Sequence, residues 1–195
     1  VLYTFRCRVY ENLSDLIAEN QRITGFCTHE AATIHIATTD DDPVRVRQYP
    51  LAYKHLDTVD TQIAKWTTEG VIELCEALDH SNNPLLVVPK RDLAGNTKSW
   101  RVCIDPRMIN KKIKDSTYPL PLMRQIFDSL AGKKIFSVMD FDAGFNRIKV
   151  LKAHRKKTAF TWKGKTWQFV GSPFGFKNIP QDFQRIMEKV FGHLD

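Results

Sequence analysis

The 195-residue chain lacks several features that mark whole classes of protein. Its four cysteines lie far apart without a CxxC pair, and its six histidines form no HExxH pattern, which argues against a zinc site. No apolar run approaches the roughly 20 residues of a membrane span, and the amino end has no long apolar stretch typical of a signal peptide. The sequence therefore predicts one large domain or two small lobes, with free thiols and no membrane partner.

Charge is distributed unevenly along the chain. Residues 1–84 hold 7 Lys/Arg against 13 Asp/Glu, a net charge of −6, whereas residues 85–195 hold 22 against 9, a net charge of +13. In the second part aromatic residues alternate with basic ones, which fits a surface that follows a phosphate backbone. A solvated basic surface without any nucleic acid is the other interpretation, and charge alone does not choose between them.

Apolar spacing predicts both helices and strands. A helix is expected over residues 56–66 with Gly70 at its end, and a β-hairpin over 85–88 and 100–104 around a polar tip. The other expected elements are a strand over 33–38, a turn or linker over 40–43, a helix over 124–130 with Ile126, Phe127 and Leu130 directed inward, a second hairpin from 145–150 and 158–162, a strand over 167–170 and a last helix from about Asn178. This irregular order predicts an α+β fold.

Residues 135–145, which read IFSVMDFDAGF, carry the most information. The apolar run 135–139 predicts a buried strand that ends at Asp140, and Phe145 follows a turn-prone Ala-Gly pair. A carboxylate beside a core costs free energy unless it is paired, hydrogen-bonded or bound to a cation. A divalent cation engaged in phosphoryl transfer is the sharpest interpretation. A strand-end cap, or an ion pair with Arg147, is the plainer one.

Three blocks of sequence resemble reverse transcriptases, in particular those of gypsy (Ty3)-type long-terminal-repeat retrotransposons. The blocks are WRVCIDPRMINKKIK at 100–114, FSVMDFDAGFNRI at 136–148 and SPFGFKNIPQDFQRIM at 172–187. Their order makes the resemblance specific, and it covers roughly residues 43–195. It implies the fingers and incomplete palm of a right-hand polymerase, an antiparallel sheet with packed helices. The implied divisions are 1–44 as an N-terminal extension or connector, 45–115 and 148–178 as fingers, and 116–147 and 179–195 as partial palm.

The resemblance also implies roles for individual residues. Asp140 matches the first metal-binding aspartate, and the backbone carbonyl of Phe141 is a further ligand. Phe145 matches the aromatic residue beneath the incoming sugar, which excludes a ribose 2′-hydroxyl. Lys90 and Arg101 match the cations that grip the triphosphate. Pro173, Phe174 and Gly175 match the segment over the nucleotide and template base, and Asp105, Arg107 and Asn110 match structural or template-facing positions.

The implied ligands are an RNA or DNA template–primer, a deoxynucleoside triphosphate and Mg²⁺, with two ions in the complete enzyme. Two such ions activate the primer 3′-oxygen and neutralise the leaving pyrophosphate, and cations on the triphosphate assist them. Each assignment has a plainer alternative. Phe145 could fill a core, Arg101 could be an exposed cross-strand partner, and Lys90 could be an ordinary charge at a hairpin tip.

One element of the family pattern is missing from the sequence. Polymerases of this family carry an aromatic-x-Asp-Asp turn after the last helix, and these 195 residues contain none. Asp142 is a weak candidate for a second ligand, and one carboxylate rarely holds two ions. We therefore expect a fragment of an RNA-directed DNA polymerase, inactive alone, which needs the rest of the polymerase and an RNase H-like region downstream.

The expected location is intracellular, in a cytoplasmic particle, the nucleus or both. The alternative function is that of a domesticated or degraded remnant that binds nucleic acid or a protein without catalysis. An RNA-templated RNA polymerase is disfavoured by Phe145, because an enzyme that uses ribonucleotides needs room for the 2′-hydroxyl.

Overall fold

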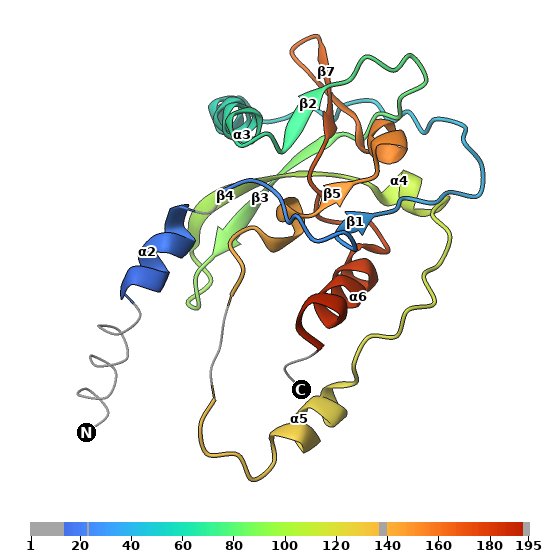
Figure 1. Cartoon of the computed structure of the whole chain (residues 1–195). Coiled ribbons are helices and arrows are strands. Elements are labelled where there is room, and N and C mark those ends of the chain that lie inside the picture. Colours follow the sequence, from blue (N-terminus) through green and yellow to red (C-terminus); the bar gives the residue numbers. More distant parts are fainter. Residues whose placement is uncertain (1–13, 23, 137–139, 193–195) are drawn as a thin grey trace.

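The computed structural model describes residues 14–22, 24–136 and 140–192 (Figure 1). Helices and short strands alternate without a repeating order, which confirms the α+β class. The helices are α2 (Ser14–Arg22), α3 (Leu56–Thr68), α4 (Arg107–Asn110), α5 (Met123–Leu130) and α6 (Ile179–Phe191), with 3₁₀ helices η1 (Tyr53–His55), η2 (Gly144–Arg147) and η3 (Lys152–Thr158). The strands are β1 (Thr33–Ile34), β2 (Ile72–Leu74), β3 (Leu85–Arg91), β4 (Thr97–Ile104), β5 (Lys149–Val150), β6 (Phe160–Trp162) and β7 (Lys165–Phe169).

Part of the core lies between α3 and a three-stranded antiparallel sheet of order β2-β7-β6. Val59 and Ile63 are buried on α3, at the spacing that the sequence predicts for one helical face. Trp66 follows them, and its ring centroid lies 5.2 Å from that of Phe169 on β7 and 6.4 Å from that of Phe160 on β6. The predicted helix is therefore confirmed, and the backbone reverses at Gly70, where φ is +68°.

The predicted β-hairpin is confirmed as β3 and β4, which are longer than expected. Its base is buried where Leu85 pairs with Ile104, and it becomes exposed toward the tip. The predicted final helix is confirmed as α6, which has Asn178 as its N-cap and Pro180 in its first turn. In the described part of the chain, no helix is both long and apolar enough to cross a membrane.

One prediction of strand pairing is wrong, and one predicted strand is shorter than expected. The expected second hairpin does not form, because β5 pairs in parallel with β1 while β6 pairs with β7. Between β5 and β6 the chain winds into η3, whose last residue, Thr158, is fully buried. The Thr158 hydroxyl accepts a hydrogen bond from the backbone N–H of Phe169 at 2.9 Å, which directs β6 onto β7. The expected strand over 33–38 is confirmed only at Thr33–Ile34.

Two predictions of burial are also wrong. Ile135 and Phe136 are 84% and 57% exposed and belong to no strand, and residues 137–139 lie outside the described part of the chain. Helix α5 forms as predicted, but its apolar face, including Ile126, Phe127 and Leu130, is exposed rather than inward. Figure 1 shows the reason: α5 lies apart from the β-sheets, at the end of two long connecting segments. Amphipathic spacing identifies such a face but not what covers it.

Residues 33–46 form a segment, here called the strap, that joins three distant parts of the chain. Backbone N–H groups make the links: Leu151 donates to Ile34 O at 2.9 Å, Thr39 to Lys112 O at 2.8 Å, and Val46 to Asn82 O at 2.9 Å. The strap therefore packs against the body of the fold, and whether it belongs to a separate connector stays a prediction.

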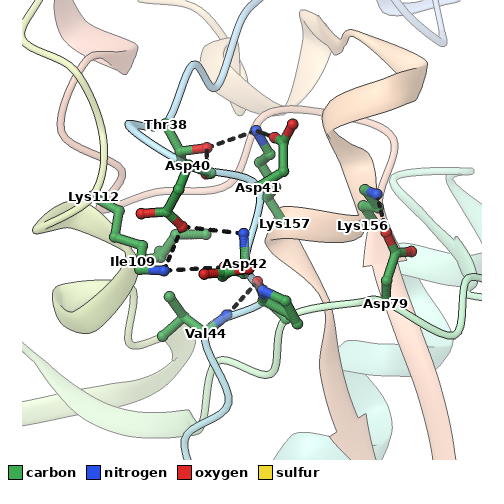
Figure 2. Close-up of a pocket in the computed structure, with 12 residues that line it drawn as sticks. Thr38, Asp40, Asp41, Asp42, Val44, Asp79, Ile109, Lys112, Lys156 and Lys157 are labelled. Carbon is green, nitrogen blue, oxygen red and sulfur yellow. Dashed lines mark hydrogen bonds and ion pairs between the residues drawn. The ribbon is translucent and has the colours of Figure 1, made fainter.

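The strap is also held by ion pairs around its acidic turn (Figure 2). Lys112 Nζ lies 2.5 Å from Asp40 Oδ1, and Lys157 Nζ lies 3.2 Å from Asp41 Oδ1. The side chain of Lys157 is only 8% exposed, and its ammonium also donates to Thr38 Oγ1 at 2.8 Å and to Ile36 O at 3.2 Å. A buried ammonium needs such partners, so the strap neutralises a charge inside the fold.

Candidate active site

The segment after Asp140 turns sharply inward. Asp140 itself is exposed, and Ala143 adopts the left-handed conformation, with φ of 52°, just before η2. At Gly144 a Cβ atom would lie 3.0 Å from Phe141 Cβ and 3.5 Å from the ring of Phe183, so a larger residue there would push on Phe141. The turn places Phe145 against the body of the fold while the Asp140 carboxylate remains in water.

Aromatic rings join this turn to the block at 172–187. The ring centroid of Phe145 lies 5.2 Å from that of Phe174 and 4.9 Å from that of Phe183, both in edge-to-face geometry. Phe141 extends the cluster, 6.2 Å from Phe183 and 6.1 Å from Phe191. Two predicted site residues, Phe145 and Phe174, are therefore in contact. Phe183 of α6, which is partly buried against the core, completes the cluster.

The turn that carries Phe174 and Gly175 lies beside the base of the hairpin. A small open pocket is shared by Val102, Cys103 and Ile104 of β4 with Asn146, Pro173 and Phe174, among other residues. Burial raises the pKa of the Cys103 thiol, so this pocket does not contain an activated thiolate at neutral pH. Arg101 directly precedes Val102, the first β4 residue that lines this pocket.

The two predicted triphosphate cations share one face of the hairpin. Arg101 pairs with Val88 and Lys90 pairs with Ser99, and side chains two residues apart on a strand point to the same side. Both cations are exposed, and neither makes an ion pair within the described residues. Trp100 points to the opposite side, where its ring lies 4.2 Å from that of His55. The hairpin is therefore braced on one face and offers free positive charge on the other.

The block at 100–114 also contains a structural ion pair. Asp105 is buried, and Arg107 binds both of its carboxylate oxygens, with Nη2 at 2.7 Å from Oδ2. Hydrogen bonding from this guanidinium holds the pKa of Asp105 below its usual range, although burial acts in the opposite direction. The Tyr49 hydroxyl donates to the same carboxylate at 3.2 Å. These contacts favour the structural interpretation of Asp105 and Arg107.

Part of the positive charge of residues 85–195 is neutralised by ion pairs within the chain. Five of the ten ion pairs among the described residues join an acid of residues 1–84 to a base of residues 85–195. The bases engaged in this way are Lys112, Arg155, Lys156, Lys157 and Lys163. A phosphate-binding surface therefore depends on the remaining bases, which include Lys90 and Arg101.

Asp140 fits one part of a divalent metal site. Arg147 pairs with Asp142, with 3.8 Å between Nη2 and Oδ2, and no ion pair of Asp140 occurs among the described residues. An exposed, unpaired carboxylate suits a hard cation. Within the described ranges, however, no group of three or more His, Cys, Asp or Glu residues could hold a metal ion. Asp140 and the Phe141 carbonyl would thus need further ligands from outside this set.

Comparisons with known proteins agree with the geometry of the three blocks. Residues 88–195 match the family described as "Reverse transcriptase (RNA-dependent DNA polymerase)". The chain is 33% identical over 157 residues to the retrovirus-related Pol polyprotein from transposon 412 of Drosophila melanogaster, covering 80% of the chain and 12% of that polyprotein. It is 32% identical over 162 residues to the Pol polyprotein from transposon gypsy of the same organism, covering 82% of the chain and 15% of the polyprotein. The chain thus spans a small part of these relatives.

Solved structures show the same fold. Native prototype foamy virus protease–reverse transcriptase superposes with a TM-score of 0.77 at 24% identity, covering 94% of this chain and 24% of that one. A foamy viral protease–reverse transcriptase in complex with double-stranded DNA gives a TM-score of 0.67 at 26% identity, covering 94% of this chain and 32% of that one. Since the family match extends over more than half of its residues, the chain belongs to the reverse transcriptase (RNA-dependent DNA polymerase) family.

Proposed function

We propose that the chain forms the fingers and part of the palm of an RNA-directed DNA polymerase encoded in a retrotransposon polyprotein. The contact between Phe145 and Phe174 carries this proposal, because it joins two of the three family blocks, one of which contains Asp140. The substrates would be a template–primer and a deoxynucleoside triphosphate. That a related foamy viral enzyme is solved with double-stranded DNA supports a nucleic-acid partner.

Each residue would have a distinct task. The Asp140 carboxylate and the Phe141 carbonyl would hold Mg²⁺, which when bound lowers the charge on the phosphates and activates the primer 3′-oxygen. Lys90 and Arg101, on one exposed hairpin face, would bind the triphosphate, Arg101 bidentately and Lys90 as a point charge. The Phe145 ring, fixed between Phe174 and Phe183, would leave no room for a 2′-hydroxyl.

Primer extension tests the polymerase proposal. Residues 1–195 alone should not extend a primer, whereas a chain continued through an aromatic-x-Asp-Asp turn should do so with magnesium. In that longer chain, Asp140→Asn should lower the rate by more than about a hundredfold, because a metal ligand contributes several kcal/mol to the transition state. Asp128→Asn, an exposed carboxylate on α5, is the matched control and should leave the rate unchanged. Efficient synthesis by residues 1–195 would contradict the proposal.

A non-catalytic remnant is the competing function, and the parent reading frame separates the two. An aromatic-x-Asp-Asp turn followed by RNase H-like carboxylates supports the polymerase, whereas a stop codon directly after Asp195 supports the remnant. We further propose that the parent protein acts in cytoplasmic particles, the nucleus or both, which fluorescent tagging of the whole polyprotein would test.

The sugar-gate assignment predicts a change in substrate selectivity. Phe145→Val or Phe145→Ala in the longer chain should relax discrimination against ribonucleotides, because removing the ring opens space for the 2′-hydroxyl. Single-nucleotide incorporation with dNTP and rNTP measures the ratio of kcat/KM values. Phe127→Ala, the same substitution at an exposed phenylalanine of α5, should not alter this ratio. An unchanged ratio in both Phe145 variants would count against the gate.

Binding to nucleic acid should depend steeply on salt. Each phosphate contact that releases a counterion contributes a slope of roughly −0.7 to −0.9 to log K against log [salt]. The five internally paired bases should contribute little, so the total slope should be well below the +13 formal charge of residues 85–195. Fluorescence anisotropy with an RNA/DNA hybrid at several salt concentrations measures it. A flat response would indicate a protein partner instead.

A further inference from the structure

Helix α4 packs against the turn at residues 174–177 and is itself held firmly in the fold. The backbone N–H of Asp105 donates to Pro84 O at 2.8 Å, and its carboxylate is bound by Arg107. Ile109, in the middle of the helix, is 1% exposed and belongs to the core. Although α4 has only one turn, it is therefore tied to the hairpin base on one side and to the core on the other.

Asn110, the last residue of α4, uses both ends of its amide group on the neighbouring turn. Its Nδ2 donates to the backbone carbonyl of Gly175 at 2.9 Å, and its Oδ1 accepts from the backbone N–H of Lys177 at 3.1 Å. An amide carries a donor and an acceptor side by side in one planar group, and Gln, the other amide side chain, is one methylene longer. The side chain thus fixes both position and orientation of residues 175–177.

Gly175 is seated tightly on the same helix. Its φ of +96° is a conformation that side chains rarely adopt, and a Cβ atom there would lie 3.2 Å from Cγ of Pro106. Pro106 is buried and is the N-cap of α4. The turn is therefore held against α4 at both ends of this short helix, by packing at Pro106 and by hydrogen bonds at Asn110.

The position of this turn affects the position of the Phe145 ring. Phe174 precedes Gly175, and its ring meets Phe145 with centroids 5.2 Å apart. Among the described residues, the other ring neighbour of Phe145 is Phe183, on α6. Phe145 is thus held between a helix and a turn, and Asn110 determines where the turn lies.

We propose that Asn110 is a positioning residue for sugar discrimination. By holding the 175–177 backbone it keeps the Phe174 ring against Phe145, and so fixes the position of the Phe145 ring that would exclude a 2′-hydroxyl. This inference rests on the proposed polymerase function. Asn110 would touch neither nucleotide nor metal in this role. Its loss should therefore change the choice between sugars, which a general loss of stability would not do.

The test compares three variants in the chain continued through the Asp-Asp turn. Asn110→Ala removes both hydrogen bonds, and the ratio of kcat/KM for dNTP over rNTP should fall roughly fivefold to thirtyfold, as expected for one or two ordinary hydrogen bonds. Asn110→Asp keeps the acceptor for Lys177 and should give an intermediate ratio. The control is Asn83→Ala, which removes two hydrogen bonds, to the carbonyls of Lys157 and Ala159, and should lower stability without changing the ratio.

Amide hydrogen exchange provides a second readout on residues 1–195. Exchange at the Lys177 N–H should be faster in Asn110→Ala than in Asn83→Ala or the wild type. An active enzyme whose Asn110→Ala ratio equals the wild-type ratio would overturn the inference alone, as would unchanged Lys177 exchange. A wild-type enzyme that makes no DNA would overturn the proposed function and the inference with it.

Discussion

Gly171→Ala tests whether the backbone beside Phe145 is as closely packed as the structure shows. Gly171 is buried, and a Cβ atom there would lie 2.2 Å from the backbone oxygen of Asn146 and 3.0 Å from Cε1 of Phe26. Real Cβ atoms essentially never approach within 3.0 Å, so one of the two backbones must move. Neither moves freely, because the Gly171 N–H donates to Val71 O at 3.1 Å and the next residue, Ser172, bonds to Ile148 O at 2.8 Å.

The loss of folding stability in Gly171→Ala follows from this geometry. Overpacking a core costs typically about 1–3 kcal/mol, and the obstructing atom here is a backbone oxygen rather than the end of a flexible side chain. We therefore expect the upper end of that range, about 3 kcal/mol. For a chain of this size such a loss lowers Tm by roughly 6–12 °C. Because Asn146 adjoins Phe145, the movement would also disturb the aromatic cluster.

Thermal unfolding followed by circular dichroism measures this effect on residues 1–195. The matched control is Gly192→Ala, the same substitution at a position with helical backbone (φ −60°) and no atom within 4 Å of the new Cβ. It should leave Tm unchanged or raise it slightly, since alanine favours the helical conformation. If Gly171→Ala unfolded at the same temperature as Gly192→Ala, the close packing of residues 146 and 171 would be refuted.

Two further predictions concern the strap. Burial lowers the pKa of His154, with Lys157 and His35 adding to the effect and Asp41 opposing it, and Nδ1 accepts the N–H of Ile36 at 3.1 Å. The contribution of neutral His154 to folding stability should be complete above about pH 6.5 and lost as the pH falls below this value. The urea midpoint should therefore change more between pH 7.5 and pH 5.5 in the wild type than in His154→Asn. An equal change in both proteins would contradict this. Lys157→Met should lower the free energy of unfolding by about 2–4 kcal/mol, because buried acceptors lose their charged donor. Asp41→Asn should lower it much less, because Asp41 is 89% exposed. Equal denaturant midpoints for the two variants would disprove this difference.

The sequence predicts best the elements whose pattern is local. Helices α3 and α6 and the hairpin β3–β4 have clear periodicity and clear end signals, and all three are confirmed. The pairing of β5 with β1 was missed because each of these strands has two residues and the partners lie more than a hundred residues apart. The exposure of α5 was missed because a periodic apolar stripe does not reveal whether anything packs over it.

The site divides in the same way. The three blocks identify the family and place Asp140, Phe145 and Phe174 in order, but no local pattern predicts that the two rings meet. The role of Asn110 in holding the 175–177 turn is equally invisible, since both hydrogen bonds join residues more than sixty positions apart. The individual catalytic and nucleotide-binding roles, and the division into fingers and palm, stay predictions.

The strap has a consequence for where this chain can be truncated. The family match begins at residue 88, yet a fragment starting there would lose β1, the partner of β5, and with it Ile34, which pairs with the buried Val150. It would also leave the ammonium of Lys157 inside the protein without the oxygens of the strap, which is costly. The unit that folds is therefore larger than residues 88–195, over which the family match extends, and expression boundaries should be set upstream of Ala32.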